Sequence, residues 1–127
     1  MTVANQQAPT VILAEDEQTL RALLSKQLRY LGYQVLETSD GLEALAVFEQ
    51  SPEADLLITD IMMPSMGGIE LAERVRKKNP DLPIIFISGY LNDTNLDFTK
   101  IRGRTLSLRK PFTLRVLADK VEEILGE

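Results

Sequence analysis

"LLITDIMMPSMGG", residues 56–68, is an apolar run that ends in a carboxylate and continues into a loop. Residues 56–59 have the composition of a short strand that is buried on both faces. Asp60 follows directly, and the loop after it contains Gly67 and Gly68, which permit a close turn. A carboxylate next to a core strand is costly to bury, so the position of Asp60 requires an explanation from the rest of the chain.

Four further runs have strand length and strand composition. They are residues 10–15 (TVILAE), 33–37 (YQVLE), 83–88 (PIIFIS) and 105–109 (TLSLR). Helical patterns separate them and carry end signals: a leucine stripe closed by Gly32, an Asp40–Glu43 capping box, a stop at Asn79–Pro80, and a Thr113 cap. Residues 91–103 have only a partial stripe, and we expect a short, mobile fourth helix there.

Strands that alternate with helices predict an α/β fold, a doubly wound five-stranded parallel sheet covered by helices on both faces. In such folds the ligands bind outside the carboxyl ends of the strands, at the switch point between strands 1 and 3. Asp60 lies at the carboxyl end of the third predicted strand. This position explains why a carboxylate follows a core strand.

The composition of the 127 residues excludes several classes of protein. The chain has no cysteine and no histidine, which excludes disulfides, thiolate metal sites and catalysis by its own histidine. The net charge of −5 argues against nucleic acid, and no apolar run has the length of a membrane span. We expect a cytoplasmic protein with a flexible tail over residues 1–9 and one domain over residues 10–127.

Polar side chains follow the other predicted strands as well. Glu15 and Asp16 end the first strand, Ser88 ends the fourth, and Lys110 follows the fifth. Carboxylate oxygens suit Mg²⁺, and a carboxylate beside this ion can attack phosphorus to form an acyl phosphate. A lysine would neutralise the transferred group, and a hydroxyl could donate a hydrogen bond to it. The pattern predicts a site that accepts a phosphoryl group.

These segments resemble the receiver domain of two-component response regulators. The matching pieces are "LAEDE", "LLITDIMMPSMGG", "IFISG" and "LRKPF". The resemblance implies a flavodoxin-like (CheY-like) fold with strand order 2-1-3-4-5. It implies phosphorylation of Asp60 assisted by Ser88 and Lys110, a cis Lys110–Pro111 bond, and Mg²⁺ held by Glu15 (through water), Asp16, Asp60 and the main-chain carbonyl of Met62. Within the family, the chain looks most similar to stand-alone CpdR-like regulators and to receivers of CckA-type hybrid kinases.

The resemblance also implies the partners. Because the chain lacks histidine, the phosphoryl donor must be another molecule, expected to be a histidine kinase or a histidine phosphotransfer protein. The output is expected to be a protein contact through the face made by residues 91–103, the fifth strand and the last helix. The short tail favours a single-domain regulator, and the alternative is the receiver portion of a hybrid histidine kinase. A haloacid-dehalogenase-like phosphatase would need an acid at position 62, where methionine stands.

Four positions are compared with the family pattern. Gly67 replaces the usual aspartate, which we expect to loosen the loop without removing a ligand. Ser107 stands where a switching tyrosine or phenylalanine is common, so the usual aromatic rotation is in doubt. Met62 and Tyr90 occupy the two positions that flank the phosphoryl group in the family. Neither side chain can orient water with a carboxylate or an amide, so slow loss of the phosphate is expected.

Overall fold

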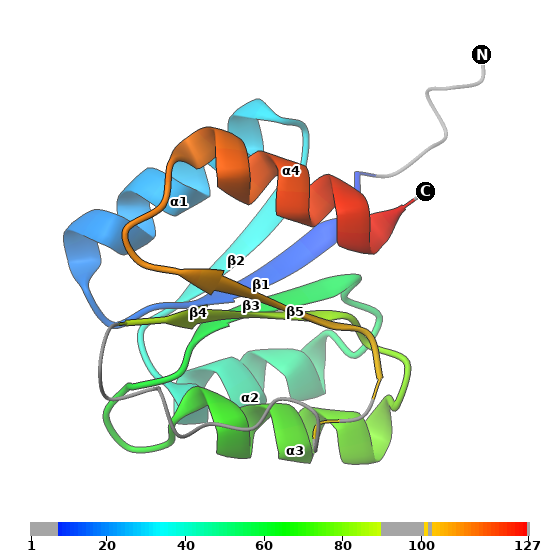
Figure 1. The fold of residues 1–127 in the computed structure, drawn as a ribbon. Helices are drawn as coiled ribbons and strands as arrows, with labels where there is room; N and C mark the ends of the chain where they lie inside the picture. The colour runs from blue at the N-terminus through cyan, green and yellow to red at the C-terminus, as the bar shows by residue number, and fades with distance from the viewer. Residues whose placement is uncertain (1–7, 90–100, 102, 127) are drawn as a thin grey trace.

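The computed structural model describes residues 8–89, 101 and 103–126 (Figure 1). Within them, the chain forms one parallel sheet in the order β2-β1-β3-β4-β5, which confirms the expected order 2-1-3-4-5. The strands are β1 (Thr10–Ala14), β2 (Gln34–Thr38), β3 (Leu56–Asp60), β4 (Ile84–Ser88) and β5 (Thr105–Arg109).

Helices cover both faces of this sheet, as Figure 1 shows. Helices α1 (Gln18–Tyr30) and α4 (Leu114–Leu125) lie on one face, and α2 (Gly41–Gln50) and α3 (Gly68–Lys78) lie on the other. The final helix α4 is the one expected after Thr113. The segment expected to form a fourth helix, residues 91–103, lies outside the described residues except for 101 and 103. Among the described helices, none has the length and apolar character needed to cross a membrane.

The sheet has a buried centre and partly exposed edges. Every residue of β3 and β4 is buried, and β1 is buried from Val11 onward. The edge strands β2 and β5 mix buried and exposed positions. Two apolar clusters result, one under α2 and α3 that includes Phe48 and Phe86, and one under α1 and α4 that includes Leu28 and Leu117. Burial on both faces explains why the central strands are nearly continuous in apolar residues.

The predicted helix ends are largely correct. The side chains of Asp40 and Thr113 accept hydrogen bonds from the amides three residues later, and Gly32 has a φ of 101° just after α1. The capping box differs from the usual pattern, because the carboxylate of Glu43 accepts from the amide of Ser39 rather than from that of Asp40.

Several strand boundaries differ from the prediction by one residue. The first strand ends at Ala14 rather than at position 15, the second covers Gln34–Thr38, and the third includes Asp60. The amide of Glu15 still donates to the carbonyl of Thr38, at 3.1 Å, although the chain turns toward α1 at this point. Strand ends are read least well from sequence, because the last backbone hydrogen bonds depend on the neighbouring strand.

Gly68 allows α3 to start against the backbone of β3. A Cβ atom at this position would lie 2.2 Å from the carbonyl oxygen of Asp60 and 3.1 Å from Cα of Ile61. The amide of Gly68 donates to the carbonyl of Ile61 at 2.9 Å, so the two segments are in direct contact. A larger residue would have to push the backbone of Asp60 or that of α3 out of place.

We therefore expect Gly68→Ala to lower the free energy of unfolding by roughly 2–3 kcal/mol, because the new methyl group overlaps backbone atoms that cannot move aside. Urea denaturation followed by circular dichroism measures this loss. Gly32→Ala is the control, since a Cβ there meets open space and the substitution costs only about 1 kcal/mol for its left-handed conformation. Equal losses in the two variants would contradict the close approach at Gly68.

Candidate functional site

Three carboxylates meet at the carboxyl edge of the sheet. Glu15 and Asp16 follow β1, and Asp60 is the last residue of the neighbouring strand β3. Each of the three offers an oxygen atom, and these atoms all lie within 4.8 Å of one another. The side chain of Glu15 is fully buried, Asp60 is 5% exposed, and Asp16 is exposed to solvent. The sequence analysis predicted that these residues would lie together, and they do.

Lys110 lies next to this cluster. Its Nζ donates to Oδ2 of Asp60 at 3.0 Å and lies 4.0 Å from Oε1 of Glu15. Partial burial lowers the pKa of Lys110, but the hydrogen bond and charge of Asp60 outweigh it, helped by the charges of Glu15 and Asp16. The net effect raises the pKa of Lys110 above its ordinary value, so the ammonium group is held in its charged form.

Glu15 is in an unusual electrostatic position. Burial raises its pKa to about 7, and the charge of Asp60 adds to this, although the amide of Glu17 and the charge of Lys110 oppose it. Oε2 of Glu15 accepts from that amide at 3.0 Å. Oε1 is buried and has no hydrogen-bond partner among the described residues. Such an oxygen is costly to leave unsatisfied unless a further positive group or a donor faces it.

The backbones of Ser88 and Met62 lie beside the carboxylates. The carbonyl of Ser88, at the end of β4, accepts from the amide of Lys110 at 2.8 Å, and the Ser88 residue is 8% exposed. The amide of Met62 donates to Oδ1 of Asp60 at 3.3 Å. The side chain of Met62 is 58% exposed at the rim of the site. The residues predicted as acceptor, metal ligands, hydroxyl and lysine therefore all lie at the carboxyl edge of the sheet.

Other expectations for this region have mixed outcomes. The bond between Lys110 and Pro111 is cis, as the resemblance implied. Gly67 is the N-cap of α3 and has no side chain with which to cap it. Ser107 is exposed in the middle of β5, opposite Phe86 of β4. Tyr90 lies outside the described residues.

Several residues that hold the site were not predicted from the sequence. Glu17 caps α1 with its side chain, and its amide holds the carboxylate of Glu15. Arg21 donates to the carbonyl of Glu15 at 2.8 Å. The buried hydroxyl of Thr59 donates to the carbonyl of Asp60 at 2.9 Å. A polar residue on an amphipathic helix is read as solvent-facing, so no signal in the sequence singles out Arg21.

The chemistry of the cluster follows from these contacts. Three carboxylates present hard oxygen atoms to one small volume, and a single ammonium group lies beside them among the described residues. The negative charges of these carboxylates repel one another at neutral pH. The cluster therefore favours a divalent cation that prefers oxygen ligands. Asp60 has one oxygen held by Lys110 and the other by the amide of Met62, so its carboxylate is fixed in direction.

Comparisons with known proteins agree with this geometry. Residues 11–122 match the family model described as the response regulator receiver domain. The response regulator receiver protein CpdR of Brucella abortus (strain 2308) is 40% identical over 116 residues, which cover 91% of this chain and 95% of that protein. The sensor kinase CckA of the same organism is 38% identical over 117 residues, but the chain spans only 12% of the length of that protein.

A solved structure gives the same result. The crystal structure of the receiver domain from the hybrid histidine kinase CckA has a TM-score of 0.77 and 32% sequence identity, and the match covers 91% of this chain and 98% of that one. Receiver domains accept phosphoryl groups and interact with histidine kinases or phosphotransfer proteins. The chain belongs to the response regulator receiver domain family of two-component signalling.

Proposed function

We propose that this receiver domain takes a phosphoryl group from a phosphohistidine onto Asp60, and signals through contacts with other proteins. The observation that carries this is the contact between Asp60 and Lys110, at 3.0 Å, within a cluster of three carboxylates. A carboxylate oxygen of Asp60 attacks phosphorus, and the bond from phosphorus to the imidazole nitrogen of the donor breaks. The imidazole keeps the electron pair, and an acyl phosphate remains on Asp60.

Each neighbouring residue has a role in this transfer. The ammonium group of Lys110 offsets the charge of the transferred group, as a fixed cation does in other phosphoryl transfers. Ser88 stands at the end of β4, joined to Lys110 by a backbone hydrogen bond, and its hydroxyl would donate to a phosphoryl oxygen. The protein then acts on itself as both catalyst and acceptor, rather than turning over a separate substrate.

The carboxylate cluster fits Mg²⁺. The residues that would hold the ion are Asp16, Asp60, the carbonyl of Met62, and Glu15 through a water molecule. The unpartnered buried oxygen of Glu15 supports this assignment, since a hydrated cation would supply the missing donor. When bound, the ion contributes positive charge next to the transferred phosphoryl group.

The partners follow from the same site. Because the chain contains no histidine of its own, the phosphoryl group must come from another molecule, and membership of the receiver family makes a histidine kinase or a histidine phosphotransfer protein the expected donor. We expect the output to be a protein contact through residues 91–103, β5 and α4. The net charge of −5 argues against nucleic acid as a partner. The similarity to CpdR over 95% of its length favours a single-domain regulator over the receiver portion of a hybrid kinase.

The first test concerns the acceptor. Incubation with acetyl phosphate and Mg²⁺, followed by mass spectrometry of the intact protein, should show one added phosphate. Asp60→Asn should abolish this addition, because an amide cannot form the acyl phosphate. Asp81→Asn is the control, since Asp81 is an exposed carboxylate of the loop before β4 and should leave the addition unchanged. A phosphate that persists on the Asp60→Asn protein would exclude Asp60 as the acceptor.

The second test uses the raised pKa of Glu15. The pKa of Glu15 rises from 4.5 to about 7 on folding, so between these values the folded protein binds more protons than the unfolded one. The contribution of Glu15 to stability is therefore present below about pH 4.5 and is lost as the pH rises through 7, on the order of 2–3 kcal/mol. With EDTA, urea denaturation should show this fall in the wild type and not in Glu15→Gln.

Stabilisation by Mg²⁺ should have the opposite pH dependence and increase as the pH rises. Because the ion binds the ionised cluster, its stabilising effect should be larger at about pH 8 than at about pH 5. The same urea series with an excess of MgCl₂ measures this difference. An equal effect of Mg²⁺ at both pH values, or no effect at either, would count against a metal site that includes Glu15.

The third test concerns the lifetime of the phosphate. The apolar side chain of Met62 lies exposed at the rim and cannot orient an attacking water molecule. We expect Met62→Asn to speed loss of the phosphate by about tenfold, which corresponds to ~1.4 kcal/mol in the barrier. Met62→Leu keeps the apolar bulk and should behave like the wild type. Mass spectra taken over time after removal of acetyl phosphate give the rates, and identical rates in all three proteins would exclude control by this position.

A further inference from the structure

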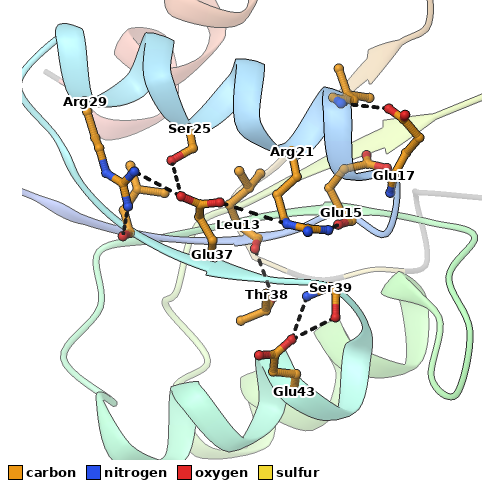
Figure 2. A network of polar contacts seen from close by, with 12 residues as sticks. Leu13, Glu15, Glu17, Arg21, Ser25, Arg29, Glu37, Thr38, Ser39 and Glu43 are labelled. Carbon is orange, nitrogen blue, oxygen red and sulfur yellow. Dashed lines mark hydrogen bonds and ion pairs between the residues drawn. The ribbon is translucent and has the colours of Figure 1, made fainter.

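A chain of polar contacts runs from Glu37 on the edge strand β2 through Arg21 on α1 to Glu15, as Figure 2 shows. Its central residue is Arg21 on the second turn of α1. Nη1 of Arg21 donates to the main-chain carbonyl of Glu15 at 2.8 Å, and Nε lies 4.0 Å from Oε1 of Glu37 on β2. The side chain of Arg21 is only 19% exposed, so this charge is not an ordinary solvated surface group.

The contacts of Glu37 hold its carboxylate in the position that faces the guanidinium group of Arg21. Oε2 of Glu37 accepts from the hydroxyl of Ser25 at 2.8 Å and pairs with Nη1 of Arg29 at 3.0 Å. Ser25 is 1% exposed, which places this end of the network inside the contact between α1 and the sheet. The buried hydroxyl of Ser25 holds the carboxylate of Glu37 against α1, where it faces the guanidinium group of Arg21, and this contact remains when Arg29 is replaced.

Arg21 completes the anchoring of Glu15. The amide of Glu15 donates to the carbonyl of Thr38 at 3.1 Å, and its carboxylate accepts from the amide of Glu17 at 3.0 Å. The contact from Arg21 holds the carbonyl, so among the polar atoms of Glu15 only Oε1 lacks a hydrogen-bond partner in the described residues. This carbonyl belongs to the peptide that joins Glu15 to Asp16. The direction of the Asp16 side chain therefore depends on the donor that holds the preceding peptide.

We infer that Arg21 is a positioning residue for the carboxylate cluster: fixed by Glu37, it sets the peptide between Glu15 and Asp16 in the orientation that binds a divalent cation. This inference rests on the proposed metal site. Residues that orient the ligands of a metal change its affinity without touching it, typically by tenfold or more. Arg21 would thus act on metal binding and, through it, on phosphorylation of Asp60.

The experiment measures metal affinity separately from stability. Mn²⁺ is the probe, because it prefers the same oxygen ligands as Mg²⁺ and its free form is detected by electron paramagnetic resonance. The full chain is titrated with Mn²⁺ well below its melting temperature, and urea denaturation gives the free energy of unfolding of each variant. Arg21→Gln removes the positive charge and the planar guanidinium group, whereas Arg21→Lys keeps a cation that can still reach the carbonyl of Glu15.

Arg29→Gln is the matched control. Arg29 lies two turns further along α1, pairs with Glu37 at 3.0 Å and donates to the carbonyl of Val35 at 3.1 Å, so it ties α1 to β2 as Arg21 does. It has no contact with Glu15 among the interactions of the described residues. A merely structural role for Arg21 predicts that Arg21→Gln and Arg29→Gln change only the stability and both leave Mn²⁺ affinity unchanged.

The expected result is Mn²⁺ binding about tenfold weaker in Arg21→Gln, partly restored in Arg21→Lys, and within about twofold of wild type in Arg29→Gln. The Mn²⁺ affinity of Glu37→Gln should lie between those of Arg21→Gln and the wild type, because the guanidinium group of Arg21 loses its ionic partner. Wild-type affinity in Arg21→Gln, or an equal loss in Arg29→Gln, overturns the positioning role. If Arg21→Gln does not fold, the other two variants decide. Wild-type Mn²⁺ affinity in both Glu37→Gln and Arg21→Lys then overturns the positioning role. If the wild type binds no Mn²⁺, the metal site fails, and this inference fails with it.

Discussion

The carboxyl groups of Glu15 and Asp60 are buried at one edge of the sheet, next to the ammonium group of Lys110. Two buried negative charges without compensation would cost several kcal/mol, so the position of this lysine is the constraint on which the site depends. Lys110 lies 3.0 Å from Asp60 and 4.0 Å from Glu15, and its amide is tied to the carbonyl of Ser88. Burial, and after it the charge of Asp60, raises the pKa of Glu15 to about 7 in spite of Lys110, so ionising Glu15 near neutral pH favours binding of a further cation.

The fold brings these groups together through the order of its strands. In a parallel sheet the carboxyl ends of all strands lie at the same edge, and β1 and β3 are neighbours, so their terminal carboxylates converge. Two glycines let helices begin close behind that edge. A Cβ at Gly68 would overlap the backbone of Asp60, and a Cβ at Gly41 would overlap that of Met66. The loop after Asp60 is thereby packed between α2 and α3 rather than left free.

The central strands and the functional edge could be predicted from the sequence because the signals for them are local and periodic. The continuous apolar runs of β3 and β4 identify central strands, and the position of Asp60 at a strand end then identifies the functional edge. Arg21 could not be predicted, because a charged residue on an amphipathic helix is assigned to solvent unless its partners on other elements are known. The cap of α1 was also missed, because residues 15–17 are all acidic and only the turn after β1 selects Glu17.

Strand β5 is fastened at both ends by polar groups. Lys110 follows its carboxyl end, and near its amino end the guanidinium group of Arg76 donates to the hydroxyl of Thr105 at 2.9 Å and to the carbonyl of Leu82 at 3.0 Å. Between them stands the exposed Ser107, in place of the aromatic residue common in the family. A serine has too small a side chain to carry a change in packing by rotation. The backbone ladder between β4 and β5, whose register joins Ile84–Ser88 to Thr105–Arg109, connects Ser107 directly to the strand that ends at the site.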